Sequence, residues 1–177
     1  MSEPSEEFEY VWNAMRADDL AELEMIRQIV DGFPQSVDHW IGRRWIINAI
    51  DSGSLVTMTW MIEKRVPLVF RDDEGYTVLH RCIEQFSEHK DPVMHRAMRA
   101  LIAAGADFNL KGINDWTPLH AAVAWGDLEA IQILLETGAD RTIKTTIDNY
   151  ESAEEHAIRI GYKGAIRLFS EIARQKI

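Results

Sequence analysis

The chain has little cysteine and no long apolar run. One cysteine among 177 residues, Cys82, excludes an internal disulfide framework. No stretch is apolar for long enough to span a membrane, and the acidic N-terminus lacks the apolar core of a signal peptide. With 46% hydrophobic and 27% charged residues, the chain can still bury a continuous core. These features predict one domain in the reducing environment of the cytoplasm.

Sequence signatures of catalysis and of cofactor binding are also missing. No glycine-rich phosphate loop precedes a helix, and no serine or cysteine has a nucleophile signature around it. Zinc-finger spacing is absent from the possible ligands His80, Cys82, His89 and His95. We expect Cys82 to be a buried, inert thiol and the run 154–156, Glu-Glu-His, to face solvent. The sequence thus predicts no metal and no cofactor, and leaves an enzyme as a remote alternative.

Positive charge is scarce, and the deficit is local. The net charge is −10, of which residues 1–38 carry −8. That segment sets two bases, Arg16 and Arg27, against ten acids: Glu3, Glu6, Glu7, Glu9, Asp18, Asp19, Glu22, Glu24, Asp31 and Asp38. Such an excess argues against a nucleic-acid ligand, whose phosphates it would repel. It is typical both of a solubilising cap and of a docking patch for a basic partner, and both interpretations stay open.

Two columns of apolar residues repeat through the chain. Small residues stand at Ala14, Ala49, Cys82, Ala122 and Ala157, and larger ones at Ile26, Met61, Leu101, Leu134 and Phe169. Both columns have a period near 33 to 35 residues with a single step of 40, which predicts a solenoid of helix pairs. The long step falls at different places in the two columns. The third unit therefore has seven extra residues between its helices.

The fourth unit identifies the repeat. Residues 114–140 read NDWTPLHAAVAWGDLEAIQILLETGAD, which closely resembles the ankyrin repeat, and residues 75–80 and 101–109 repeat the pattern more loosely. Thr117 is a good N-cap and Pro118 suits the first helical position, so a helix is expected to run to about Trp125. A second apolar stripe then predicts a helix that ends at Gly138. The resemblance implies that the Thr and His of this motif bond to each other and to adjoining loops.

Together these patterns predict an all-α ankyrin-repeat solenoid of about five helix-turn-helix units with short β-hairpin finger loops. A single domain covers residues 1–177, with units at about 5–38, 39–71, 72–111, 112–147 and 148–177. The first and last units are expected to be caps, because terminal repeats need a polar outer face. The insertion around 87–91 is expected to form a loop, with Pro92 opening a lengthened helix through Ala103.

The family resemblance also implies where a partner binds. In ankyrin domains the binding surface is the concave one, formed by the finger loops and the exposed side of each first helix. Carried over residue by residue, it selects Trp40, Arg43, Asp73, Glu74, Tyr76, Glu84, Gln85, Ile113, Asn114, Trp116, Ala124 and Trp125. Four of these are expected to form one aromatic strip: Trp40, Tyr76, Trp116 and Trp125. The remaining tryptophans Trp12, Trp45 and Trp60 are assigned to packing between repeats.

The sequence therefore favours a protein-binding module without catalysis. Because only ankyrin units are recognisable, we expect no attached effector domain, and a small cytoplasmic inhibitor or adaptor that occludes or holds a partner protein ranks first. One specific version is a bacterial immunity protein that neutralises a toxin. The alternative is a structural or scaffolding subunit of a larger complex, or a self-associating protein. No nucleic acid and no membrane is expected among the partners.

Overall fold

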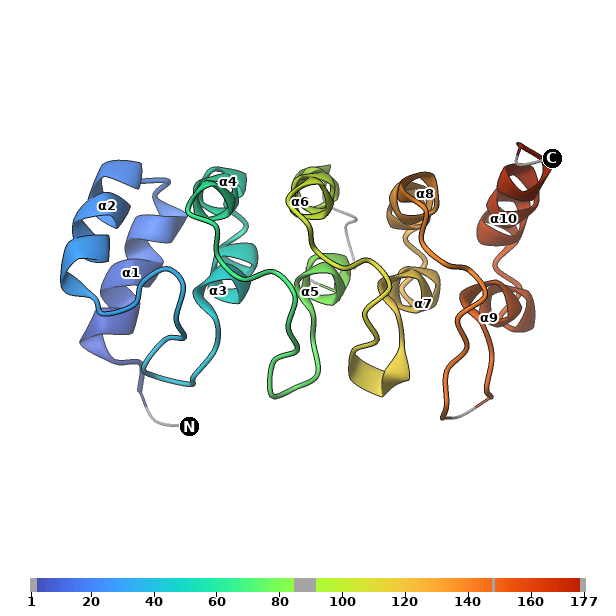
Figure 1. Ribbon diagram of the computed structural model, residues 1–177, viewed down its shortest axis with the longest axis horizontal. Helices are drawn as coiled ribbons and strands as arrows, with labels where there is room; N and C mark the ends of the chain where they lie inside the picture. The colour runs from blue at the N-terminus through green and yellow to red at the C-terminus, as the bar shows by residue number, and fades with distance from the viewer. Residues whose placement is uncertain (1–2, 85–91, 148, 176–177) are drawn as a thin grey trace.

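Short polar residues mark the points where helices begin. The computed structural model describes residues 3–84, 92–147 and 149–175 (Figure 1). Ser5, Asp19, Ser54, Asp127 and Ser152 each precede a helix, and each side chain accepts a hydrogen bond of 2.9 to 3.3 Å from the backbone N–H three residues on. Such caps satisfy N–H groups that have no partner inside the helix. Local sequence therefore sets most helix starts.

The helices form two layers. The inner layer consists of α1 (Glu6–Arg16), α3 (Trp45–Ser52), α5 (Val78–Glu84), α7 (Pro118–Ala124) and α9 (Ala153–Arg159). The outer layer consists of α2 (Leu20–Ile29), α4 (Leu55–Glu63), α6 (Pro92–Ala103), α8 (Leu128–Thr137) and α10 (Lys163–Gln175). A short 3-10 helix, η1 (Ile113–Asp115), lies in one finger loop. Each inner helix packs against the outer helix that follows it and against the inner helix of the next pair.

Figure 1 shows these pairs stacked along one axis, with the loops that join successive pairs projecting beyond the inner layer as fingers. The all-α ankyrin-repeat solenoid predicted from the sequence is confirmed. In the described residues, the expected finger hairpins are reduced to two isolated antiparallel bridges, Val37 with Arg44 and Lys144 with Ser152. None of the helices in these ranges combines the length and hydropathy needed to cross a membrane.

The two apolar columns of the sequence form the spine of the core. The small column lies on the inner helices and is at most 6% exposed, and the large column lies on the outer helices and is fully buried. Small side chains let neighbouring inner helices approach closely, and the larger ones fill the space between the layers. The insertion ends where predicted, because α6 begins at Pro92 and reaches Ala103. Its loop, residues 85–91, lies outside the described residues.

Two buried threonine–histidine pairs join consecutive units. His120 Nε2 lies 3.1 Å from the carbonyl oxygen of Glu151 in the next finger, and its Nδ1 lies 2.8 Å from Thr117 Oγ1. His80 repeats the arrangement with Thr77. A carbonyl oxygen can only accept a hydrogen bond, so Nε2 carries the proton and Nδ1 accepts from the threonine hydroxyl. The structural role expected for His120 is confirmed.

The second unit lacks this pair and uses another device. Arg44 stands where the third and fourth units have threonine, and it makes no side-chain cap. The buried Asp38 carboxylate instead accepts hydrogen bonds from the N–H groups of Trp40 and Ile41, at 3.1 and 2.8 Å, and from Asn48 Nδ2 at 2.9 Å. A buried carboxylate with three donors is well compensated. The second finger is therefore held by its own aspartate.

Candidate functional site

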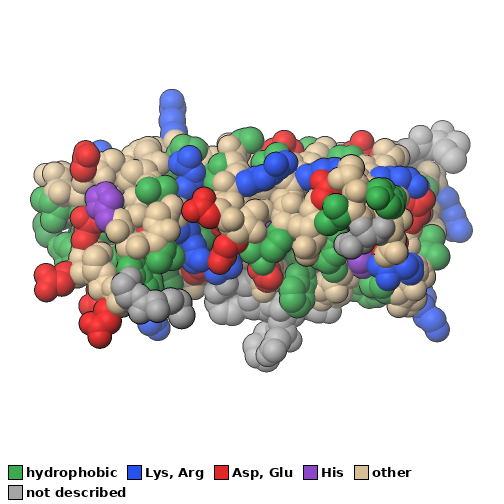
Figure 2. Space-filling model, turned by 90° about the horizontal axis from the view of Figure 1, so that it is seen from below, with side chains coloured by type: hydrophobic (Ala, Val, Ile, Leu, Met, Phe, Trp, Pro, Cys, Tyr) green, Lys and Arg blue, Asp and Glu red, His purple; other side chains and the backbone are tan. Residues whose placement is uncertain are grey.

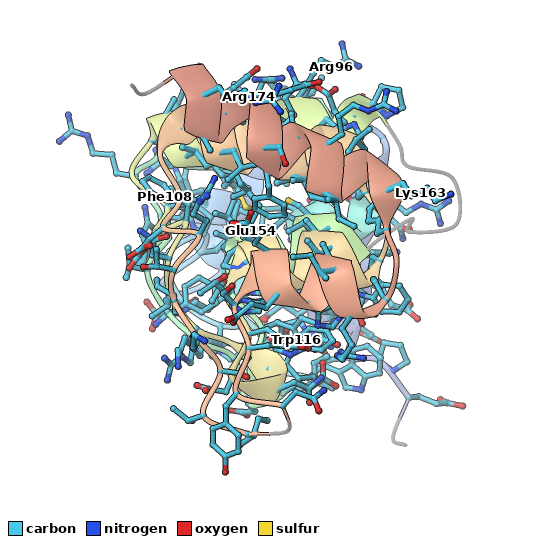
Figure 3. All side chains as sticks on the ribbon, turned by 90° about the vertical axis from the view of Figure 1, so that its right-hand side faces the viewer. Arg96, Phe108, Trp116, Glu154, Lys163 and Arg174 are labelled. Carbon is cyan, nitrogen blue, oxygen red and sulfur yellow. The ribbon has the colours of Figure 1, made fainter. Side chains whose placement is uncertain are left out.

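The surface made by the fingers and by the exposed sides of the inner helices is here called the finger face. Figure 2 looks onto it and shows acidic side chains gathered at its N-terminal end, with hydrophobic side chains along its length. In Figure 3, Trp116 lies on this side of the inner helices, whereas Arg96 and Arg174 lie at the outer layer. Most of the residues that the sequence selected lie in clefts of the finger face or in the ion pairs between them, and three of these clefts contain aromatic residues of the selected set.

The central cleft gathers three of the four aromatic residues expected to form a strip. Tyr76, Trp116 and Trp125 line it together with Glu84, Ile113 and Asn114. Trp125 is 45% exposed, whereas Tyr76 and Trp116 are half-buried. Exposed aromatic side chains on a rigid scaffold are the residue type enriched at protein interfaces. In the structure, aromatic residues of two consecutive units thus share one cleft.

Tyr76 is held in place by charged neighbours. The guanidinium carbon of Arg81 lies 5.7 Å from the centroid of its ring. Partial burial, and then the hydrogen bond with the Glu84 carboxylate, raise the pKa of Tyr76 to about 12. Its hydroxyl therefore stays protonated at neutral pH. The ring and hydroxyl offer a partner one apolar surface and one polar end.

An ion-pair network separates the central cleft from the N-terminal part of the finger face. Asp51 Oδ1 is 2.6 Å from Arg81 Nε, and Asp51 Oδ2 is 3.0 Å from Arg43 Nη1. Arg43 also reaches Glu74 at 3.5 Å. The side chains of Asp51, Arg43 and Arg81 are only 12 to 21% exposed, so solvent screens these pairs weakly. Arg43 and Glu74 were selected from the sequence; the contribution of Arg81 was not foreseen.

The N-terminal cleft contains the fourth aromatic residue, Trp40. The cleft has a volume of about 550 Å³ and is lined by Phe8, Trp12, Trp40, Glu9, Arg43 and Asp51, among others. The Phe8 ring lies 5.9 Å from the Trp12 ring in a stacked arrangement and 4.8 Å from the Trp40 ring. The prediction that the four aromatic residues form one continuous strip is therefore wrong. Trp40 packs against α1 instead, beyond the ion-pair network.

Trp12 corrects a second expectation. It was assigned to packing between repeats together with Trp45 and Trp60, which are indeed buried at 1% and 5% exposure. Trp12 is only half-buried and lines the N-terminal cleft. The i, i+4 spacing of Phe8 and Trp12 was the available signal, because it places both rings on one side of α1.

The third cleft lies at the C-terminal end of the finger face, where Trp116, Glu151, His156 and Arg159 contribute to its lining. His156 is buried, with Nδ1 2.9 Å from Glu151 Oε1 and its ring centroid 5.8 Å from that of Trp116. Burial lowers the pKa of His156 despite that carboxylate. The expectation that the 154–156 run faces solvent is thus wrong for His156. The burial of His156 was not foreseen because Trp116, 40 positions earlier, is brought to it by tertiary packing.

The remaining selected residues take simpler positions. Asp73 is exposed in a finger and lines a further cleft with Arg43 and Glu74, and Ala124 is half-buried at the end of α7. Gln85 and the insertion loop, with His89, lie outside the described residues. The structure thus places the described selected residues on the finger face. Their role as a partner-binding set stays a prediction.

Some of the acidic side chains of the first unit make contacts within the protein. Glu24 accepts hydrogen bonds from Lys64, from Arg27 at 2.9 Å and from Trp60 Nε1 at 3.0 Å, and the two bases hold the pKa of Glu24 down at about 2. Glu7 Oε1 lies 2.8 Å from His39 Nδ1, and the two form an ion pair when the imidazole is protonated. Glu6 and Glu9 remain exposed on α1. Glu6 and Glu9 are therefore among the negative charges that a partner can meet, together with exposed acids outside α1 such as Glu3 and Asp31.

Metal and thiol chemistry find no support in the described residues. No group of three or more His, Cys, Asp or Glu side chains there is placed to hold a metal ion. Cys82 is buried, and that burial raises the pKa of its thiol well above the usual range. A buried thiol with a raised pKa is a poor nucleophile. Cys82 therefore acts as a small core residue.

Comparison with known proteins supports the repeat assignment. A family model described as Ankyrin repeats (many copies) matches residues 94–135. A probable serine/threonine-protein kinase of Dictyostelium discoideum is 33% identical over 86 residues, which are 49% of this chain and 10% of the kinase. Protein phosphatase 1 regulatory subunit 12A of Mus musculus and of Rattus norvegicus is 49% identical over 43 residues, which are 24% of this chain and 4% of each subunit. The aligned segments thus span a tenth or less of these relatives.

Proposed function

Because the chain belongs to the ankyrin-repeat family, whose repeats are protein–protein interaction modules, we propose that it binds a partner protein through its finger face, without catalysis of its own. The observation that carries this proposal is the central cleft, where Tyr76, Trp116 and Trp125 from two consecutive units share one surface. Trp125 in particular is a large apolar side chain left 45% exposed by the fold. Aromatic anchors of this kind supply most of the binding energy at many interfaces.

We propose that the protein acts as an inhibitor or an adaptor, in that its solenoid occludes or holds the partner. The similarity to a phosphatase regulatory subunit, which is by its name a regulator of an enzyme, supports an adaptor role. A bacterial immunity protein that neutralises a toxin is one specific version. The neighbouring genes test that version, because a toxin gene beside this one is expected if it holds. The cytoplasmic location expected from the sequence stays a prediction.

A photo-cross-linking experiment tests binding at the finger face. A benzophenone amino acid replaces Trp125 in one variant and Arg96, which is exposed on the outer helix α6, in the other. In cells that express the protein, we expect one protein to cross-link to the variant at position 125 and not to the variant at 96. Tyr76→Ala should then abolish that product. Equal cross-linking from both positions, or only from position 96, would show that the interface lies elsewhere.

Self-association is the second candidate function, and one observation favours it. Met25 and Ile29, four residues apart on α2, are 54% and 71% exposed at the N-terminal end of the solenoid. Exposed apolar side chains on a terminal repeat are what a stacked neighbour would cover. Sedimentation equilibrium tests this candidate. A dimer that Met25→Ser and Ile29→Ser convert to monomer supports it, and a monomeric parent protein excludes it.

A further inference from the structure

The N-terminal cleft differs from the other two clefts in its combination of rings and charge. Three aromatic side chains converge on it, from α1 and from the second finger: Phe8, Trp12 and Trp40. Trp12 and Trp40 are half-buried, and the tilt of 56° between the Phe8 and Trp40 rings makes the wall angular rather than flat. A volume of about 550 Å³ is within the range of pockets that enclose a ligand group.

The charged groups around this cleft favour a cation. Glu9 lines it from an exposed position on α1. The one basic side chain among its described lining residues, Arg43, is compensated by Asp51 at 3.0 Å and by Glu74 at 3.5 Å. The α1 side of the cleft, with Phe8, Glu9 and Trp12, belongs to the segment 1–38, which carries −8 of the net charge of −10. An incoming positive charge therefore meets a negative field and a lining carboxylate.

We propose that the N-terminal cleft receives a lysine or arginine side chain from a basic segment of the partner protein. The aromatic rings contact the aliphatic stem, the π faces attract the cation, and the Glu9 carboxylate pairs with the charged end. This inference rests on the proposed function, which it extends by naming the chemistry of one contact. It also gives the negative charge of α1 a specific role in docking rather than a general one in solubility.

A small probe tests the cleft without requiring the partner. The full chain is labelled with 5-fluorotryptophan, and its fluorine NMR signals are assigned by single Trp→Phe variants. N-acetyl-lysine methylamide is titrated at low salt, and N-acetyl-norleucine methylamide, which lacks only the ammonium group, is the matched control. We expect saturable shifts of the Trp12 and Trp40 signals with the lysine probe, at least about fivefold weaker binding of the norleucine probe, and no shift at Trp60. Equal binding of both probes would show a purely apolar site, and no shift with either would remove the site.

Two variants test the local role of charge. Glu9→Gln should weaken the lysine probe by about two- to fivefold, the range for one partly exposed ion pair. Asp31→Asn removes the same charge at an exposed site of the first unit outside the described lining of the cleft, and should leave binding unchanged. Equal weakening by the two variants would reduce the effect to net charge and overturn the proposal. Both lie at exposed positions, and the thermal midpoint verifies folding.

The outcome separates the two proposals. If the lysine probe fails while position 125 still cross-links to its partner, the cleft is excluded and the finger-face interface stands. If the probe binds as expected while cross-linking fails, the cleft recognises a cation but the central cleft is not the interface.

Discussion

The imidazole of His80 and the main-chain carbonyl of Trp116 are joined by a hydrogen bond of 3.0 Å across 36 positions of sequence. His80 belongs to an inner helix and Trp116 to the next finger, so the bond fixes one unit against its neighbour. Trp116 also lines the central cleft. The buried network that holds the solenoid together therefore also positions a proposed contact residue.

Thr117, which forms the equivalent pair with His120 in the fourth unit, is expected to stabilise the fold. Thr117→Ala removes the hydroxyl that His120 Nδ1 contacts at 2.8 Å and leaves the start of α7 without its cap. We expect a loss of about 0.5–2 kcal/mol in the free energy of unfolding, measured in urea. Thr142→Ala, at an exposed finger position where the hydroxyl bonds Asp140 two residues earlier, is the comparison for threonine loss outside the helix caps. An unchanged urea midpoint for Thr117→Ala would contradict the role of the pair.

Stability should fall as the pH drops below about 6.5. Burial lowers the pKa of His80 to about 4, and it also lowers the pKa values of His120 and His156. Between pH 6.5 and 4 the unfolded chain binds a proton at His80 that the folded chain does not, so acid favours unfolding. His80 therefore contributes about 3 kcal/mol to the free energy of unfolding. This contribution is fully present above pH 6.5 and is lost as the pH falls toward about 4. NMR titration of the His80 imidazole checks the pKa, and a stability that stays flat over this range would contradict it.

Close packing of two fingers predicts opposite effects for two glycine substitutions. A Cβ at Gly112 would lie 2.7 Å from the carbonyl oxygen of Gly75 and 2.8 Å from His80 Cε1. Gly112→Ala should therefore cost about 1–3 kcal/mol of stability. Gly164→Ala in helix α10 is the control, because a Cβ there meets side-chain atoms rather than backbone, at 3.3 Å from Tyr162 Cε2 and 3.5 Å or more from Leu128. It should be neutral or stabilise by up to about 1 kcal/mol. Equal effects in thermal unfolding would show that the fingers can separate freely.

The aromatic residues of the central cleft should separate binding from folding. Trp125→Ala changes a side chain that is 45% exposed, so it should alter stability by about 0.5 kcal/mol or less. At an interface the same change should cost about 2 kcal/mol or more of binding energy. Trp116 suits this test less well than the sequence suggested, since it is half-buried and packs against His156. Calorimetry with the partner that cross-linking identifies checks the affinity. Unimpaired binding of Trp125→Ala would exclude the central cleft as the binding site.

Charge on α1 should govern the rate of association with a basic partner. Reversing Glu6 and Glu9 to Lys leaves the Glu7–His39 pair intact and changes only exposed positions. We expect association at low salt to slow by about two- to tenfold and to depend less on salt. Dissociation should also quicken, because Glu9 is proposed to pair with the bound cation in the N-terminal cleft. Stopped-flow measurements over a range of ionic strength check this. Identical association rates at low salt would leave α1 as a solubilising cap.

The helices were predictable because their signals are local. Ser and Asp caps, Pro118 at the first position of α7 and Gly138 at the end of α8 each act within a few residues of the bond they make or replace. The two apolar columns were predictable for a related reason. A stacked repeat must bury the same positions in every unit, so its core residues recur in the sequence with the period of the repeat.

The site was less predictable because it joins residues of different units. Arg81 stands where the fourth unit has Ala121, and this departure from the repeat was the one visible signal of its role. That it meets Asp51, 30 positions earlier, depends on the stacking of α3 and α5. The aromatic residues lie in separate clefts, and the ion-pair network near them joins residues of the second and third units.

By itself, then, the sequence determined the repeat, the helix ends and the surface on which a partner is expected, because each depends on local bonds or on strict periodicity. Only the tertiary structure decided how Trp40, Tyr76 and Trp116 are grouped, and which carboxylates of the first unit are already paired. Those outcomes depend on the identity of the residue that each neighbouring unit presents, and the solenoid brings such residues together only when its units stack.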